Sequence, residues 1–278
     1  MGIRVVTDSA CDLPAPLVQA LGIEVVPLTI RFGTEEFVDQ VELSAAEFWD
    51  RVERSDKLPE TAAPSPGAFE ARFRRLMDRG ATGIVCINLS SHLSGTMQSA
   101  QVAAAATVDV CPVQVIDSQS ASMGQGNLCL TAARRAADGD SLESIVAEVV
   151  DRRDRTKLFA TLDTLEFLKR GGRVGNARAL LGTVLSIKPV VELRDGVVEE
   201  AGKVRTRSKA LKLLAAKASE GKIEHLAVLD GNAPDVDDLL ALLEPIFPRD
   251  DIITGVVGPV IGTHAGPRVI GVTYQVVR

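Results

Sequence analysis

The chain has 278 residues, of which 46% are hydrophobic, 24% charged and 4% aromatic. These proportions are ordinary for a globular protein and exclude wholesale disorder, a collagen repeat and a long coiled coil. Thirty-one basic and thirty-seven acidic residues leave a net charge of −6. A chain of this charge repels nucleic acid and anionic membranes, so no nucleic-acid partner is expected.

The N-terminal half alternates short apolar runs with helical patterns. Strands are predicted over residues 3–7, 24–30, 84–88 and 113–116. Asp12 is predicted to cap a helix that Pro14 enters, and Ser44 and Glu47 form a capping box. Further helices are predicted over 66–80, from 96 onward, and over 125–137 and 141–152, with a loop over 57–66. Strands that alternate with helices predict a parallel sheet covered by helices.

The C-terminal half has a different pattern. Apolar runs over 188–193 and 197–199 flank Asp195-Gly196, the strongest short signal for a β-hairpin. A helix over 208–219, a strand over 225–229, a helix over 235–243 and a strand over 269–277 follow. At roughly 150 residues per domain the length suggests about two domains. We therefore predict an α/β protein with an N-terminal parallel-sheet domain and flanking helices, residues 1–154, and a C-terminal α+β domain, residues 155–278. The charged run over residues 151–157 interrupts the pattern, and we place the boundary within it, near residues 153–157.

The first residues lack the pattern of a secretory signal, and no apolar run reaches the roughly 18–20 residues that span a bilayer. A cytoplasmic protein is therefore expected. The four cysteines, at positions 11, 86, 111 and 129, form no Cys-x-x-Cys pair. We expect reduced thiols, with Cys86 buried in a strand, and no metal site.

Ligands of open parallel sheets bind beyond the carboxyl ends of the strands. The loop over residues 89–96 lies at such a position and carries four hydroxyl groups, on Ser90, Ser91, Ser94 and Thr96. Gly95 allows close backbone approach. The helix start that follows offers free N–H groups, which favour a carboxylate or a phosphate. The alternative is that these hydroxyl groups only cap the helix.

Ser94 and His264 also permit a serine hydrolase, with Ser94 as nucleophile and His264 as base. The nucleophile elbow of such enzymes has glycine at both flanking positions, where this chain has His92 and Thr96. His264 lies between glycines and Pro267, and we expect a tight turn there. A histidine on such a turn can donate to an anion or be an ordinary loop residue. The sequence has no Walker or dinucleotide-binding motif.

Two basic clusters interrupt the acidic chain. One surrounds Arg173 within residues 170–178, and the other surrounds Arg205 within residues 203–207. Such clusters are either solvated surface or a docking patch for phosphate or an acidic partner.

Seven motifs occur together in one order: Thr7-Asp-Ser, Thr61-x-x-Pro64-Ser, Leu89-Ser-Ser-x-Leu-Ser-Gly-Thr-x-Gln-Ser99, Gly171-Gly-Arg-Val-Gly175, Lys188-Pro, Val204-Arg-Thr and Ile261-Gly-Thr-His-Ala-Gly266. With these motifs the chain closely resembles the DegV family of bacterial fatty-acid-binding proteins. The resemblance covers essentially the whole chain, and the third motif is its most specific part.

The resemblance implies two α/β domains with a long-chain fatty acid buried between them. It places the carboxylate at Thr61 and Ser94, with His264 in the same polar network. The supporting loop would contain Ser91, Gly95 and Thr96. The protein would then be a lipid-binding carrier, with no catalytic residue and no cofactor of its own.

Some family members present the bound carboxylate to a separate fatty acid kinase, which makes an acyl phosphate. Family arginines implicated in docking to this kinase correspond to Arg173 and Arg205. This chain has Ala62-Ala63 where the family often has Ser-Gln, which leaves head-group geometry and acyl preference open. A hydrolase or acyltransferase using Ser94 and His264, an acyl-chain sensor without a kinase, and transient membrane contact also remain open.

Overall fold

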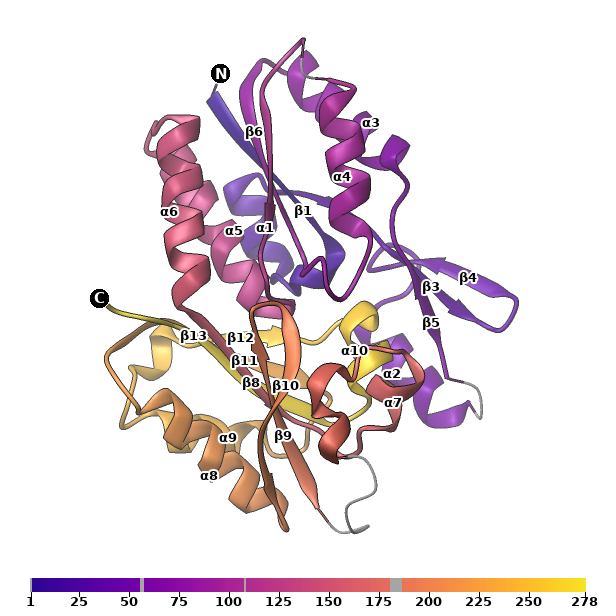
Figure 1. Ribbon diagram of the computed structural model, residues 1–278, viewed down its shortest axis with the longest axis vertical. Helices are drawn as coiled ribbons and strands as arrows, with labels where there is room; N and C mark the ends of the chain where they lie inside the picture. Colours follow the sequence, from indigo (N-terminus) through magenta and orange to yellow (C-terminus); the bar gives the residue numbers. More distant parts are fainter. Residues whose placement is uncertain (1, 56–57, 108, 181–186) are drawn as a thin grey trace.

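The computed structural model describes residues 2–55, 58–107, 109–180 and 187–278. Figure 1 shows two layered parts along the long axis, joined where helix α6 (Leu142–Arg155) runs into strand β8 (Thr156–Thr161). Most of the N-terminal half, in indigo to magenta, forms the upper part, and the C-terminal half, mainly in orange and yellow, forms the lower part. The purple helix over residues 45–54 lies level with the lower part. The fold is the mixed α/β arrangement that the sequence predicts.

The upper part contains a four-stranded sheet whose described pairs are all parallel. Its strand order is β2 (Glu24–Val26), β1 (Gly2–Asp8), β6 (Ala81–Asn88), β7 (Val113–Asp117). Cys86 and its neighbours in β6 are buried, because helices cover both faces of the sheet. On one face α3 (Pro66–Asp78) and α4 (Thr96–Ala105) pack around Phe69 and Phe73.

The other face of this sheet is covered by three helices, α1 (Ala15–Leu21), α5 (Ser122–Ala137) and α6. Residues 122–133 of α5 are all buried, because α5 lies between the two sheets and contacts β1 on one side and β8, β11 and β13 on the other. The largest hydrophobic core therefore spans both parts of the molecule.

One predicted strand, over residues 24–30, is interrupted. Pro27 has no N–H group to donate to a ladder, and the chain leaves the parallel sheet there. It continues as β3 (Thr29–Phe32) in a separate antiparallel sheet with β4 (Glu35–Val38) and β5 (Glu60–Ala62). The loop prediction over 57–66 was wrong where β5 forms, and residue 57 lies outside the described residues. Helix α2 (Ala45–Arg54) begins at the predicted capping box.

The lower part contains a six-stranded sheet, in which β11 and β12 are parallel and the other described pairs antiparallel. Its order is β10 (Val197–Val204), β9 (Lys188–Arg194), β8, β13 (Val269–Val276), β11 (Ile223–Gly231), β12 (Ile253–Val256). The predicted Asp195-Gly196 hairpin joins β9 to β10. Helices α8 (Arg207–Ala218) and α9 (Val236–Leu243) cover one face around a second core.

The short elements of the lower part were not predicted. They are β12, α7 (Glu166–Arg170), α10 (Pro259–Ala265) and the 3₁₀ turns η2 (Gly175–Leu180) and η3 (Arg249–Asp251). In the upper part, η1 (Ser9–Cys11) follows β1 directly.

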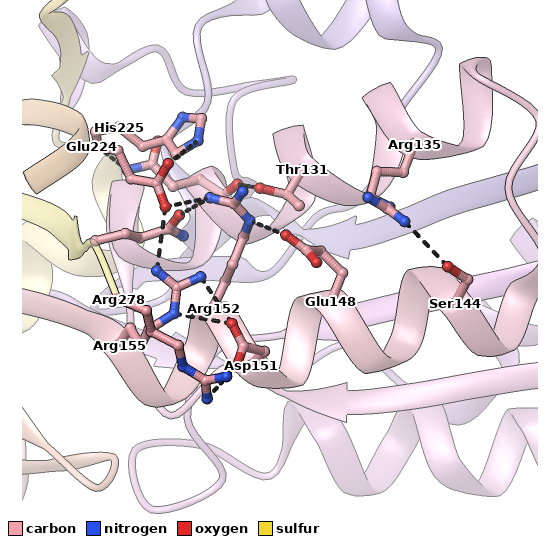
Figure 2. Close-up of polar contacts among 12 residues, drawn as sticks. Thr131, Arg135, Ser144, Glu148, Asp151, Arg152, Arg155, Glu224, His225 and Arg278 are labelled. Carbon is pink, nitrogen blue, oxygen red and sulfur yellow. Dashed lines mark hydrogen bonds and ion pairs between the residues drawn. The ribbon is translucent and has the colours of Figure 1, made fainter.

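The charged run at the end of α6 ties the helix to the lower sheet (Figure 2). Arg152 Nη1 and Arg155 Nη1 donate to Glu224 Oε1 on β11 at 2.9 and 3.2 Å. Arg152 Nη1 also reaches Gln275 Oε1 on β13 at 2.8 Å, and Arg155 Nη1 reaches the carbonyl oxygen of Val276 at 2.6 Å. The same charges that interrupt the sequence pattern therefore fasten the upper part to the lower.

Candidate ligand-binding site

An apolar cavity lies between the upper part and the lower sheet. The empty space at this site amounts to about 860 Å³, part of which is open solvent. Both halves of the chain line it with aliphatic side chains, among them Leu28, Leu89, Leu158, Leu193, Leu229 and Val269. These aliphatic walls can bury a hydrocarbon chain but offer no hydrogen-bond partner to a polar group.

A polar cavity adjoins the apolar one. Thr61, Arg173 and His264 line both cavities and therefore mark the boundary between them. Ser94 lines the apolar cavity, and Arg31 and Arg170 line the polar one. A ligand with an apolar body and a charged end can place each part in a matching environment here.

Strand β5 and helix α10 bring Thr61 and His264 together. Thr61 Oγ1 lies 2.8 Å from His264 Nε2. Burial and, to a smaller extent, the charge of Arg173 together lower the pKa of His264 to about 4. The imidazole is therefore neutral at pH 7 and carries one N–H group. When Nε2–H donates to Thr61 Oγ1, the hydroxyl hydrogen of Thr61 is free to bind an anion.

The turn expected around His264 is instead the last turn of α10. Phe48 and Trp49 of α2 pack so closely on this helix that a Cβ at Gly262 would overlap them. A Cβ at Gly171 would likewise overlap His264 Nδ1, so Gly171 makes room for the imidazole. The glycines near His264 in the sequence indicated a turn, but tertiary packing accounts for Gly262.

Ser94 is held beside the start of α4. Its Oγ lies 2.9 Å from Thr96 Oγ1 and accepts from Thr96 N–H at 3.3 Å. Thr96 is buried, and these two hydrogen bonds hold the hydroxyl group of Ser94 in place. Gly95 has φ −75° and open space around its Cα, which gives no steric reason for glycine at this position.

The other two hydroxyl groups of the loop point elsewhere. Ser91 is exposed, and its Oγ donates to Asp117 Oδ2 at 2.5 Å. Ser90 is buried and donates to the carbonyl oxygen of Gly196 at 2.7 Å. Of the four hydroxyl groups, only that of Ser94 lines the apolar cavity.

The two arginines suggested as a docking pair lie in different places. Arg173 Nε donates to the carbonyl oxygen of Leu93 at 3.0 Å, and its Nη1 donates to that of Gly171. Arg173 thus belongs to the boundary of the two cavities, although the sequence placed it outside the carboxylate loops. Arg205 is exposed after β10 and lines neither cavity.

Sequence reasoning missed the role of Asp12, which was expected to cap a helix. The N-cap of α1 is Pro14 instead. Asp12 is buried and accepts from Ser122 Oγ at 2.5 Å and from Gly258 N–H at 2.9 Å. Ser122 lines the apolar cavity and Gly258 precedes α10, so Asp12 joins three segments around the site. The only sequence signal for this role is that Asp12 lies five residues after Thr7, the first residue of the Thr7-Asp-Ser motif.

The hydroxyl and imidazole that a serine hydrolase would use are not joined. Ser94 Oγ is hydrogen-bonded to Thr96, and His264 Nε2 is hydrogen-bonded to Thr61.

Within the part of the chain that the structure describes, no cluster of three His, Cys, Asp or Glu residues could hold a metal ion. No helix in the described ranges is both long and apolar enough to cross a membrane. The four cysteines are buried, and burial raises the pKa of each thiol.

The layered α/β fold and its divided cavity define a class of protein with room for a ligand that has an apolar body and a polar end. The chain belongs to the DegV family, whose model, described as "Uncharacterised protein, DegV family", matches residues 2–276. A DegV domain-containing protein of Streptomyces coelicolor is 36% identical over 278 residues, with 98% of each chain covered. Protein DegV of Bacillus subtilis is 31% identical over 280 residues, covering 99% of each chain.

Solved structures agree over the whole length. A DegV family protein from Thermus thermophilus, described by its fatty acid binding, has a TM-score of 0.91 and 36% identity, with both chains fully covered. Bacillus subtilis DegV, described as a fatty acid binding protein, has a TM-score of 0.88 and 30% identity, again over both full chains. A stearic acid-binding protein from Eubacterium ventriosum has a TM-score of 0.89 and 25% identity, with 98% of each chain covered.

Proposed function

We propose that this protein binds a long-chain fatty acid, with the tail in the apolar cavity and the carboxylate at Thr61, Ser94 and His264. The observation that carries the proposal is the position of the Thr61–His264 pair, where an aliphatic cavity meets a polar one. The fatty-acid-binding relatives from Thermus thermophilus and Bacillus subtilis support it.

The charges around the site favour a carboxylate. His264 is neutral, and Arg173 supplies positive charge beside it. Thr61 and Ser94 each offer a hydroxyl group, and a hydrogen bond to a charged group contributes about 1.5–3 kcal/mol. The tail contributes more, because each buried methylene is worth about 0.8 kcal/mol before the costs of association. The tail therefore supplies most of the affinity, and the head group sets the orientation.

The protein acts as a carrier in this proposal and presents the carboxylate to a separate fatty acid kinase. The polar cavity gives a second molecule a route to Thr61 and His264 from outside, and Arg31 and Arg170 on its walls suit phosphate oxygens. Arg205 is exposed and is the better candidate for docking a partner, whereas Arg173 already binds two backbone carbonyl groups. Cytoplasmic location and ligand exchange at a membrane belong to the same proposal.

Mass spectrometry of an organic extract of the purified protein tests the binding step. We expect a long-chain fatty acid at close to one per protein. Binding to the folded state alone must also raise the unfolding temperature when fatty acid is added. An extract without acyl chains, together with no thermal stabilisation by added fatty acid, would contradict the proposal. Hydrolysis of an acyl ester that is lost in Ser94→Ala would favour the hydrolase instead.

A further inference from the structure

The loop that carries Ser94 is held from both sheets. In the upper sheet, the buried Asp8 carboxylate accepts from Asn88 Nδ2 at 3.0 Å and from Leu89 N–H at 2.9 Å, which fixes the start of the loop. From the lower sheet, the tip of the β9–β10 hairpin reaches the loop at Ser90. The loop therefore forms part of the contact between the two halves of the molecule.

Ser90 connects that hairpin to Ser94. Its Oγ donates to the carbonyl oxygen of Gly196 at 2.7 Å and accepts from His92 N–H at 3.2 Å. Its own carbonyl oxygen accepts from Leu93 N–H at 2.9 Å and from Ser94 N–H at 3.2 Å. Ser90 is fully buried, so water cannot replace these partners. A shift of Ser90 must therefore move the backbone of Ser94.

Gly196 allows the hairpin to come this close. Asp195 and Gly196 have φ of +52° and +80°, the combination that a tight two-residue hairpin turn requires. A Cβ at Gly196 would overlap Ser90 Oγ. Any larger residue must push the hairpin and the loop apart.

The same hairpin also forms a wall of the apolar cavity. Val191 and Leu193 on β9 and Val198 on β10 line it. We infer that Ser90 is a positioning residue, which transmits the placement of the β9–β10 hairpin to Ser94. Recognition of the carboxylate then depends on contact between the two sheets, and packing of the tail against the hairpin is coupled to the head group. This inference rests on the proposed function.

Binding of palmitic acid and of 1-hexadecanol to the parent, Ser90→Ala and Ser91→Ala tests the inference. The alcohol fills the cavity without a carboxylate. We expect Ser90→Ala to weaken binding of the acid by up to about tenfold, the equivalent of one hydrogen bond, and to leave binding of the alcohol unchanged. Ser91→Ala is the matched control, because its hydroxyl group contacts Asp117 on the outside; it should change neither affinity.

Each outcome has a defined meaning. If Ser90→Ala keeps the acid-to-alcohol preference of the parent, or weakens both ligands equally, the inference is overturned and the proposed function stands. If the parent binds neither ligand, the proposed function fails and the inference with it.

A double-mutant cycle of Ser90→Ala and Gly196→Ala tests whether the β9–β10 hairpin acts on Ser94 through Ser90. Removing Ser90 Oγ relieves the overlap that a Cβ at 196 creates. The loss of acid affinity in the double variant should therefore be smaller than the sum of the two single losses. Additive losses would show that the hairpin does not act through Ser90. Thermal unfolding without ligand identifies any variant that fails to fold, and should Gly196→Ala fail, the acid-to-alcohol ratio of Ser90→Ala decides alone.

Discussion

The buried carboxyl group of Asp12 should make the protein less stable as the pH rises. Asp12 is 3% exposed, and burial raises its pKa to about 8, with Asp39 and Asp8 adding like charge nearby. Hydrogen bonds from Ser122 and Gly258 oppose the shift without cancelling it. The folded protein therefore holds a proton on Asp12 at pH values where an exposed aspartate has lost it.

The sign of the effect follows from proton linkage. The pKa of Asp12 in the unfolded chain is near the ordinary value of 3.8. Between that pH and about 8, the unfolded chain releases a proton that the folded chain retains, so stability is greatest below the unfolded pKa and falls as the pH rises. This one group lowers the free energy of unfolding by about 1.4 kcal/mol per pH unit, or by about 4 kcal/mol between pH 5 and pH 8.

Asp12→Asn removes this titration and keeps the shape. The amide oxygen can accept from Gly258 N–H, and the amide nitrogen can donate to Ser122 Oγ. We expect the variant to lose less stability than the parent between pH 5 and pH 8, by up to about 4 kcal/mol. Asp39, whose pKa burial raises to about 7, supplies part of the slope that remains.

Urea unfolding at each pH unit from 5 to 8 measures how the free energy of unfolding changes with pH in the parent and in Asp12→Asn. Asp109→Asn makes the same chemical change at an exposed position and should keep the slope of the parent. If Asp12→Asn has the parent's slope, Asp12 is already ionised in the folded protein and the reasoning fails. An equal destabilisation at every pH would also refute it, because that result reports lost hydrogen bonds and no titration.

Three further substitutions test the ligand site and the contact between α6 and the lower sheet, and a fourth tests docking of the kinase. Thr61→Val removes the hydroxyl group beside His264 and should weaken fatty acid binding about tenfold or more, since a charge-assisted bond is worth about 1.5–3 kcal/mol; displacement of a fluorescent fatty acid measures it, and unchanged affinity would contradict the head-group assignment. Ala160→Phe places a ring in the cavity wall, so mass spectrometry of the extract should show shorter acyl chains than in the parent; the same length distribution would mean that the tail lies elsewhere. Arg155→Met removes contacts with Glu224 and should lower the free energy of unfolding by about 1–3 kcal/mol in urea titrations. An unchanged free energy of unfolding would mean that the contact between α6 and β11 does not stabilise the protein. Arg205→Glu should keep the bound acid and lose acyl-phosphate formation with a cognate kinase; full phosphorylation would make Arg205 ordinary surface.

The sequence predicted those elements whose signals are local. Ser44 and Glu47 identify the start of α2 because a capping box involves only one helical turn. Asp195-Gly196 identifies the β9–β10 hairpin because both residues adopt positive φ. Alternating strands and helices likewise predicted the parallel sheet.

Elements that depend on distant contacts were missed or wrong. β5 has three residues and forms because β3 pairs with it across 31 positions of sequence (Ile30↔Thr61). α10 contains Gly262, a residue type that normally weakens a helix, but here its missing Cβ admits Phe48 and Trp49. Asp12 resembles a helix cap in sequence, and only the folded chain shows its contacts with Ser122 and Gly258.

The candidate site shows the same division. Ordered motifs indicated Thr61, Ser94 and His264, and the structure brings Thr61 and His264 into hydrogen-bonding distance across 203 positions. The family resemblance paired Arg173 with Arg205 as docking residues, but a sequence motif carries no information on where a side chain points. The guanidinium group of Arg173 turns inward because Leu93 and Gly171 offer it carbonyl oxygens.

The strand order of the lower sheet also constrains when a ligand can be held during protein synthesis. β13 lies in the middle of the sheet, between β8 and β11, although it is the last strand in the chain order. Until residues 269–276 leave the ribosome, β8 and β11 each present an open edge, and the sheet remains in two halves. Val269 lines the cavity, so the enclosure is completed only by this late strand. A ligand should therefore be held only after β13 has been made, because the cavity lacks one of its walls until then.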